Sequence, residues 1–198
     1  MSLSLKLLIL SLAAGAMLAA DKENARFAPG PAASYATRQT IDKVTIAGVP
    51  YHTPERAREA FGKLKLSEHG VLPVLVVIQN DSSQALRFDR MRVEYNTGGG
   101  SRVEATPSGD VRYIGSGRRR TNPIPNPLPT RSRKNPLDAF EIEGRAFAAK
   151  MLPPGESAHG FYYFQVAFRE SAKLYISGIV QAATGKEIFY FEIPLDAN

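Results

Sequence analysis

The most apolar stretch of the chain runs from Val71 to Ile78 and reads VLPVLVVI. An alternating pattern would leave one face of a strand in water, whereas a nearly unbroken run bounded by turn residues predicts a strand covered on both faces. The run is too short to span a bilayer. Pro73 lies near its start, where a missing backbone donor is tolerated. We therefore expect this strand at the centre of the core.

The residues after this run predict a turn and then more strand. Asn80–Ser83 carry short polar side chains that bond the nearby backbone in turns. Leu86 and Phe88 fall at even positions, whereas Met91, Val93 and Tyr95 fall at odd positions. Because a strand has a period of two, one extra residue must be absorbed. We predict a β-bulge near Asp89–Arg90. Two short strands with a bend between them would explain the same pattern.

One helix is expected at residues 53–66. Thr53 suits the N-cap, and Pro54 suits the first helical position because its missing N–H would be unpaired there. Four apolar residues at helical spacing form one narrow face: Ala57, Ala60, Phe61 and Leu64. We expect this face to cover one end of the sheet.

Strand patterns also occupy residues 40–49, 161–168, 174–180 and 189–193. In the last of these, Phe189, Phe191 and Ile193 are expected to line one face. The glycines at 98–100 favour a hairpin turn over a phosphate cradle, since no helix start follows them. Residues 140–151 fit either a helical turn or a strand. About eight strand candidates and one short helix predict a mainly β fold, built as an antiparallel sandwich.

Two segments resemble parts of exported bacterial immunoglobulin-like domains. PVLVVIQNDSSQALRF, at residues 73–88, is similar to their paired strands, in which an apolar strand ends in an Asn–polar turn. LPPGESAHGFYYF, at residues 152–164, is similar to their element of Pro-Gly, small polar residues, Gly and an aromatic strand. The resemblance implies an immunoglobulin-like sandwich and supplies no catalytic residue.

The first twenty residues have the pattern of a secretory signal peptide. Lys6 precedes the apolar stretch LLILSLAAGAMLAA, which ends at Ala20. Cleavage there would place Leu18, and not a small residue, three positions back, so an uncleaved membrane anchor is the alternative. We interpret residues 21–39 as a flexible lead-in and residues 40–198 as the β-sandwich domain. The expected location is the periplasm or the medium outside the cell.

The amino-acid composition excludes several kinds of functional site. Among 198 residues, 43% hydrophobic, there is no cysteine. Disulfides, thiolate zinc sites, cysteine nucleophiles and a cysteine-linked lipid anchor are therefore excluded. His52, His69 and His159 are not spaced as metal ligands, and no GxSxG elbow surrounds a serine. We expect no metal, no cofactor and no enzymatic activity.

Residues 107–138 form a long basic, proline-rich loop. From position 118 to 134 there are six cations and no acid, namely Arg118, Arg119, Arg120, Arg131, Arg133 and Lys134. The formal net charge is +6, so the rest of the chain sums to zero. These six residues are the predicted binding site for an anionic partner, which would be an envelope polymer, a lipid headgroup or an acidic protein. Nucleic acid is not expected outside the cytoplasm. Incidental charge on a solvated loop is the alternative.

The sequence thus favours a non-enzymatic binding or scaffolding domain of the bacterial envelope. Two other classes stay open. A hydrolase with a site on the sandwich rim would draw on four residues: Glu141, Glu143, Glu156 and His159. A protease inhibitor would present the proline-flanked loop, with Arg120 or Arg131 meeting a trypsin-like enzyme. Tyr162–Phe164 fit either core packing or a stacking platform for sugars or bases.

Overall fold

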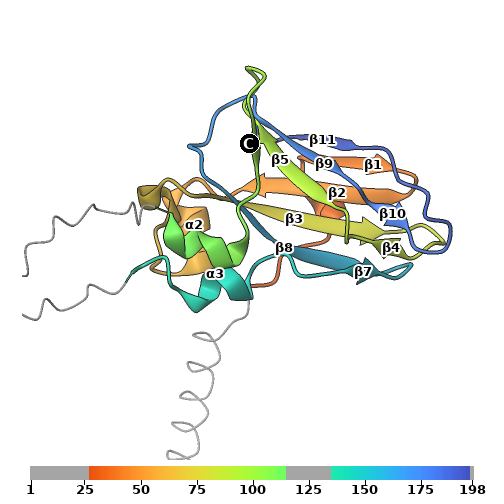
Figure 1. The fold of residues 1–198 in the computed structure, drawn as a ribbon, viewed down its shortest axis with the longest axis horizontal. Helices are drawn as coiled ribbons and strands as arrows, with labels where there is room; N and C mark the ends of the chain where they lie inside the picture. Colours follow the sequence, from red (N-terminus) through yellow and green to blue (C-terminus); the bar gives the residue numbers. More distant parts are fainter. Residues whose placement is uncertain (1–26, 115–134, 197–198) are drawn as a thin grey trace, which may run out of the picture.

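The computed structural model describes residues 27–114 and 135–196. Its strands form three antiparallel sheets (Figure 1). The first sheet has the order β1 (Arg38–Ile41), β2 (Val44–Pro50), β3 (Leu72–Asn80), β8 (Ser157–Phe164). The second has the order β11 (Phe191–Pro194), β9 (Lys173–Ser177), β5 (Arg92–Asn96), β6 (Arg102–Glu104). The third has the order β10 (Val180–Gln181), β4 (Leu86–Arg87), β7 (Met151–Leu152). The predicted mainly β class is confirmed.

Strand β3 is the buried centre of the first sheet, as the sequence predicts. It pairs with β2 on one side and with β8 on the other, and Gln79 is its only residue that is not buried. Its two faces belong to different cores. The sandwich core, shared with the second sheet, includes Val74, Val76, Ile78, Tyr95, Leu174 and Ile193. The helical core, on the opposite face, includes Leu75, Val77, Ala60, Phe61, Phe161 and Tyr163.

Short helices cover the second face of the first sheet. They are η1 (Ala32–Ser34), α2 (Pro54–Phe61), η2 (Leu66–His69), η3 (Ser108–Tyr113) and α3 (Phe140–Gly144). Thr53 is the N-cap of α2, and its side chain accepts a hydrogen bond from the Arg56 amide at 3.4 Å. The predicted helix is therefore confirmed, although it ends at Phe61. Gly62 takes a positive φ of 60°, which stops the helix before Leu64.

The predicted β-bulge is wrong, and the alternative of two short strands with a bend between them is confirmed. A turn at Asp89–Arg90, closed by the Met91 amide bonding to the Phe88 carbonyl at 3.0 Å, separates two strands in different sheets. The parity changes because the chain leaves β4 in the third sheet and enters β5 in the second. Gly178 allows this crossing, since a Cβ there would lie 2.0 Å from the Arg90 carbonyl oxygen.

Two further strand predictions are corrected. The sequence predicts one strand at residues 40–49, but the hairpin of β1 and β2 spans residues 38–50. Asp42 and Lys43 both have positive φ, as the two central residues of a type I′ turn require. In the last strand, Phe191 and Ile193 are fully buried, whereas Phe189 is 67% exposed. Phe189 precedes the first residue of β11 and so does not share its inner face.

The structure also assigns the segments for which the sequence left the secondary structure or its bounds open. Residues 140–144 form the short helix α3, and residues 151–152 form β7. The aromatic strand runs over residues 157–164, four residues earlier than the pattern indicated. Residues 27–35 of the predicted lead-in pack on the helical side: Phe27 contacts Phe161 with ring centroids 5.4 Å apart, and Ala32 is fully buried. Residues 38–39, at the end of the predicted lead-in, already belong to β1. Residues 1–26, which include the predicted signal peptide, lie outside the described part of the chain.

Asn80 joins the two segments that carry the family resemblance. Its fully buried side chain donates to the carbonyls of Gln84, Leu152 and Pro153 at 2.8–3.1 Å and accepts from Ser82. Its backbone bonds to Gly155 and Glu156. One amide thus satisfies carbonyls from two turns that are about 70 positions apart in the chain.

Candidate functional site

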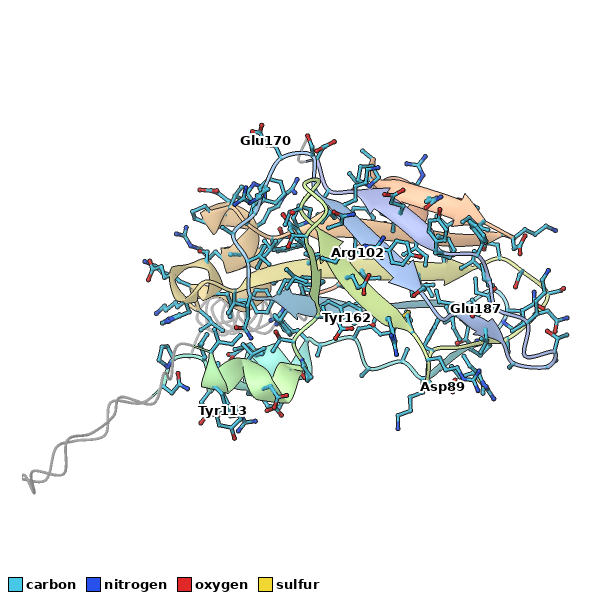
Figure 2. The ribbon with its side chains drawn as sticks, turned by 45° about the horizontal axis from the view of Figure 1, so that its top comes forward. Asp89, Arg102, Tyr113, Tyr162, Glu170 and Glu187 are labelled. Carbon is cyan, nitrogen blue, oxygen red and sulfur yellow. The ribbon has the colours of Figure 1, made fainter. Side chains whose placement is uncertain are left out.

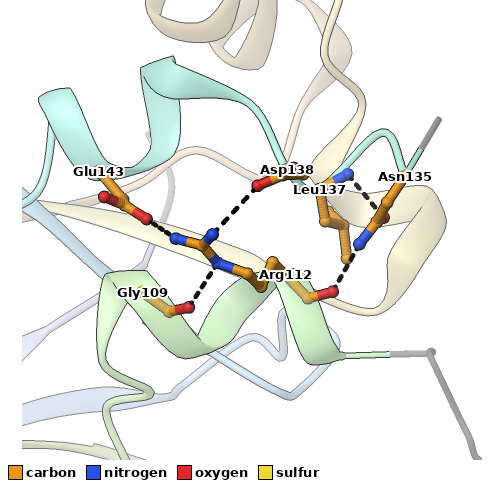
Figure 3. A network of polar contacts seen from close by, with 6 residues as sticks. All are labelled: Gly109, Arg112, Asn135, Leu137, Asp138 and Glu143. Atoms are coloured by element: carbon orange, nitrogen blue, oxygen red, sulfur yellow. Dashed lines mark hydrogen bonds and ion pairs between the residues drawn. The ribbon is translucent and has the colours of Figure 1, made fainter.

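The basic segment leaves the domain between two fixed points. Arg112 on η3 donates to the Gly109 carbonyl at 2.9 Å and forms ion pairs with Asp138, at 3.3 Å, and Glu143 (Figure 3). The Asn135 side chain donates to the Arg112 carbonyl at 2.6 Å. We call these five residues the Arg112 clamp. It holds residues 109–114 beside residues 135–143, on the helical side of the first sheet.

The six predicted anion-binding residues lie between the two ends held by the clamp. Arg118, Arg119, Arg120, Arg131, Arg133 and Lys134 all fall outside the described residues. The same holds for the loop tip proposed for a protease inhibitor. The prediction that they bind an anionic partner therefore stays a prediction.

The four hydrolase candidates are not brought together. Glu141 and His159 line one cavity, but Glu143 is paired with Arg112 in the clamp. Glu156 lies in the turn before β8, where its carbonyl accepts from the Asn80 amide. A glycosidase-type mechanism requires two carboxyl groups that face each other across the substrate. Among these four residues, only Glu141 brings a carboxyl group to the cavity.

The cavity that contains Glu141 and His159 has a volume of about 500 Å³. It lies between the start of the described chain, α3 and the edge of β8. Its walls are Phe27, Phe140, Glu141, Gly144, Arg145, Ala146, His159, Gly160 and Phe161. We call it the Arg145 cavity. It offers three aromatic rings, one guanidinium, one carboxylate and one imidazole, which suits binding better than covalent chemistry.

Backbone contacts build the wall of this cavity at β8. The Phe161 amide donates to the Arg145 carbonyl at 2.8 Å, and the Phe147 amide donates to the Phe161 carbonyl at 3.2 Å. A Cβ on Gly160 would lie 2.3 Å from the Phe147 Cα, so only glycine lets the chain pass here. Sequence reasoning missed Phe27, Phe140 and Arg145, because this approach joins segments distant in sequence.

A second hollow of about 530 Å³ lies on the other side of Ala146 and Phe161. It is lined by residues of β5, β6 and β8, among them Tyr162, which Figure 2 labels. Tyr162 stacks on Phe147 with centroids 5.6 Å apart, and burial raises the pKa of its hydroxyl. Tyr163 and Phe164 are buried in the two cores. The core-packing interpretation therefore holds for these two residues.

Exposed aromatic rings gather on the outer face of the second sheet. Tyr190 lies against Tyr175 and Phe189, with centroids 4.9 and 4.5 Å apart. The Arg102 guanidinium, labelled in Figure 2, lies over Tyr175 at 4.8 Å. Arg102 also pairs with Glu94 at 3.3 Å.

Metal and membrane features can be judged only for residues 27–114 and 135–196. There, no three or more His, Asp or Glu side chains converge as metal ligands would. In the same residues, no helix is both long and apolar enough to cross a bilayer.

Comparisons with known proteins add no assignment. No family model and no curated protein matches the sequence. Several solved structures show slight likenesses, among them the following three. A "putative lipoprotein (ycdA)" from Bacillus subtilis is 12% identical, with a TM-score of 0.39, over 81% of this chain and 39% of that one. The "putative ApaA protein" from Bordetella pertussis is 12% identical, with a TM-score of 0.36, over 82% and 98%. A "functionally unknown protein" from Listeria monocytogenes is 9% identical, with a TM-score of 0.37, over 82% and 83%. At such scores these likenesses assign neither family nor function.

Proposed function

We propose that this protein is a non-enzymatic binding domain of the bacterial cell envelope, which engages an anionic partner through residues 118–134. The proposal includes export by the signal-peptide pattern and an immunoglobulin-like arrangement of the strands. The partner is a polyanionic surface, such as anionic lipid headgroups, because clustered arginines make bidentate contacts with phosphate and carboxylate.

The observation that carries the proposal is the Arg112 clamp. It closes the helical side before and after the basic segment, so the described fold has its hydrogen bonds and cores without that segment. The excess positive charge of the chain is concentrated where it has no described structural task. Lipid headgroups fit such a segment because juxtamembrane basic residues each contribute about 1 kcal/mol near an anionic bilayer.

The test replaces all six cations of the segment by glutamine. We expect the wild-type protein to sediment with vesicles containing phosphatidylglycerol at low salt and to be released at high salt, since surface charges are screened. It should not sediment with neutral phosphatidylcholine vesicles. The six-fold variant should remain in the supernatant and keep the melting temperature of the wild type.

A matched control separates position from net charge. Six exposed cations elsewhere, Arg58, Lys63, Arg90, Lys150, Arg169 and Lys186, are changed to glutamine, which also lowers the formal charge from +6 to zero. This control should still bind anionic vesicles. Equal loss in both variants would mean that only net charge matters. Retained binding in the segment variant would show that the segment is not the binding element.

A further inference from the structure

We propose that the Arg145 cavity is a binding site for a monocarboxylate with an apolar body, and that Arg145 is the residue that recognises the carboxylate. This site is separate from the basic segment, and the proposal does not depend on the proposed envelope partner. It rests on one unpaired guanidinium nitrogen, on the fixed backbone around it and on the chemistry of the cavity wall.

The Arg145 side chain has an unused donor. Its Nη1 atom is buried and makes no hydrogen bond with any described residue. Nor does any described carboxylate lie within ion-pair distance of Arg145, and its closest aromatic partner is Phe27, with the guanidinium 5.5 Å from the ring centroid. A buried donor without a partner is unfavourable and rare in folded proteins. Arg145 lines the adjoining cavity, so a rotation of its side chain would bring this donor to a ligand oxygen.

The main chain of Arg145 is held firmly at the edge of the cavity. The Arg145 amide donates to the Glu141 carbonyl of α3 at 3.2 Å, and its carbonyl accepts from the Phe161 amide of β8 at 2.8 Å. Arg145 is thus held between a helix and a strand, whose sheet is locked by two cores. A fixed backbone beneath the recognition group reduces the ordering cost that a ligand must overcome.

The other residues of the cavity wall indicate what the remainder of the ligand, apart from its carboxylate, should be. Phe27, Phe140 and Phe161 offer apolar contact, and the Phe140 side chain is 85% exposed. Covering such a ring with a ligand removes apolar surface from water. Glu141 also lines the cavity, so a dianion such as a phosphate monoester would be repelled more strongly than a singly charged carboxylate. The volume of about 500 Å³ accommodates a small organic molecule.

The experiment titrates the full-length protein with 3-phenylpropionate and, separately, with its neutral amide, followed by NMR chemical shifts. We expect the carboxylate to bind at least about tenfold more tightly than the amide, as a charge-assisted hydrogen bond requires. Equal binding of the two probes, or no binding of the carboxylate at millimolar concentration, would overturn the proposal.

Four variants then test individual residues. Arg145→Met keeps the apolar stem, and we expect it to lose the preference for the carboxylate over the amide. Glu141→Gln should bind the carboxylate severalfold more tightly because a like charge is removed. Phe140→Ala should weaken the binding of the carboxylate and of the amide equally. Arg90→Met, a change of an exposed arginine outside the cavity, should bind as the wild type does.

The thermal stability of Arg145→Met tests the role of Arg145 independently of the binding measurements. Since the buried Nη1 has no partner, Arg145→Met should melt no lower than the wild type. Undiminished carboxylate preference in this variant would refute the assignment of Arg145. If the variant does not fold, the proposal is judged on Glu141→Gln, and unchanged or weaker carboxylate binding in that variant would refute it.

Discussion

The two faces of the first sheet are covered in different ways. On the sandwich side, the cover is a second hydrogen-bonded sheet, and β3 contributes Val74, Val76 and Ile78 to a core made mostly of aliphatic side chains. On the helical side, the cover is a set of short helices of three to eight residues, joined by loops and held by the Arg112 clamp. That core is richer in aromatic rings, and the Arg145 cavity opens beside it.

Under the two proposals above, this difference separates the task of holding the fold from the task of binding. A sheet packed against a sheet gives little room for local change, because moving one strand disturbs the hydrogen bonds of its neighbours. Short helices and loops can be varied in length and sequence while the strands beneath them stay in place. The proposed binding site on the helical side thus has a rigid floor, β8, and adaptable walls.

Shortening one buried side chain in each core should give the largest change in stability and the clearest test of the difference between the two sides. We expect Ile78→Ala, on the sandwich side, to destabilise the protein by about 3–5 kcal/mol, and Leu75→Ala, on the helical side, by about 2–3 kcal/mol. Both side chains are fully buried in the same strand. The helical cover can move toward the smaller residue, whereas a sheet cannot. Urea unfolding of both variants measures the difference, and a larger loss for Leu75→Ala would contradict it.

Gly160→Ala should loosen the contact between residues 145–147 and β8. The new Cβ would clash with the Phe147 backbone and displace residues 145–147 from β8. We expect a loss of about 2 kcal/mol, as for overpacked sites. Gly109→Ala is the control, because nothing lies near its Cβ position and its φ is not positive. Thermal unfolding of the control should match that of the wild type, and similar losses in both variants would exclude the clash as the cause.

Tyr163→Phe removes a hydrogen bond that ties α3 to β8. The Tyr163 hydroxyl donates to the Ile142 carbonyl at 2.7 Å, and its loss should cost about 1–1.5 kcal/mol at neutral pH. Burial raises the pKa of Tyr163 above its ordinary value of 10. Because the folded state holds this proton more tightly, its contribution is complete below pH 10 and is lost as the pH rises beyond it.

The stability gap between wild type and Tyr163→Phe should therefore narrow at alkaline pH. Urea unfolding at pH 7 and at a pH above 10 checks this. A gap that widens with pH would show that the hydroxyl ionises more easily in the folded protein than in the unfolded chain.

Of these variants, Arg112→Met should lower the stability least, and it should loosen only the helical side of the first sheet. Its ion pairs are partly exposed, with about half of the Asp138 and Glu143 side chains accessible, so we expect a loss of about 0.5–1 kcal/mol. Amide hydrogen exchange should increase in α3 and η3 but not in β5 or β9. Uniform acceleration across both sides would mean that the clamp supports the whole fold.

The sequence predicts the features that are local. The unbroken apolar run marks β3, and Thr53 with Pro54 marks the start of α2, because burial and capping depend on neighbouring residues. The sheet change at Asp89–Arg90 was missed, because a parity break looks the same for a bulge and for a chain that crosses between sheets. Glu141 and His159 were named as candidates. Arg145 and Phe27 were not, because only the contact of residues 145–147 with β8 gives them a shared site.

The burial of β3 also has a consequence for the newly made chain. Until β8 is synthesised, the edge of β3 that β8 will pair with remains open, and β8 begins 77 residues after β3 ends. At about 5–20 residues per second, synthesis alone leaves this edge unpaired for roughly 4–15 s. An uncharged, β-branched run with one open edge is prone to intermolecular strand pairing. The segment that stabilises the finished fold is thus the one that most needs protection from aggregation before the fold is complete.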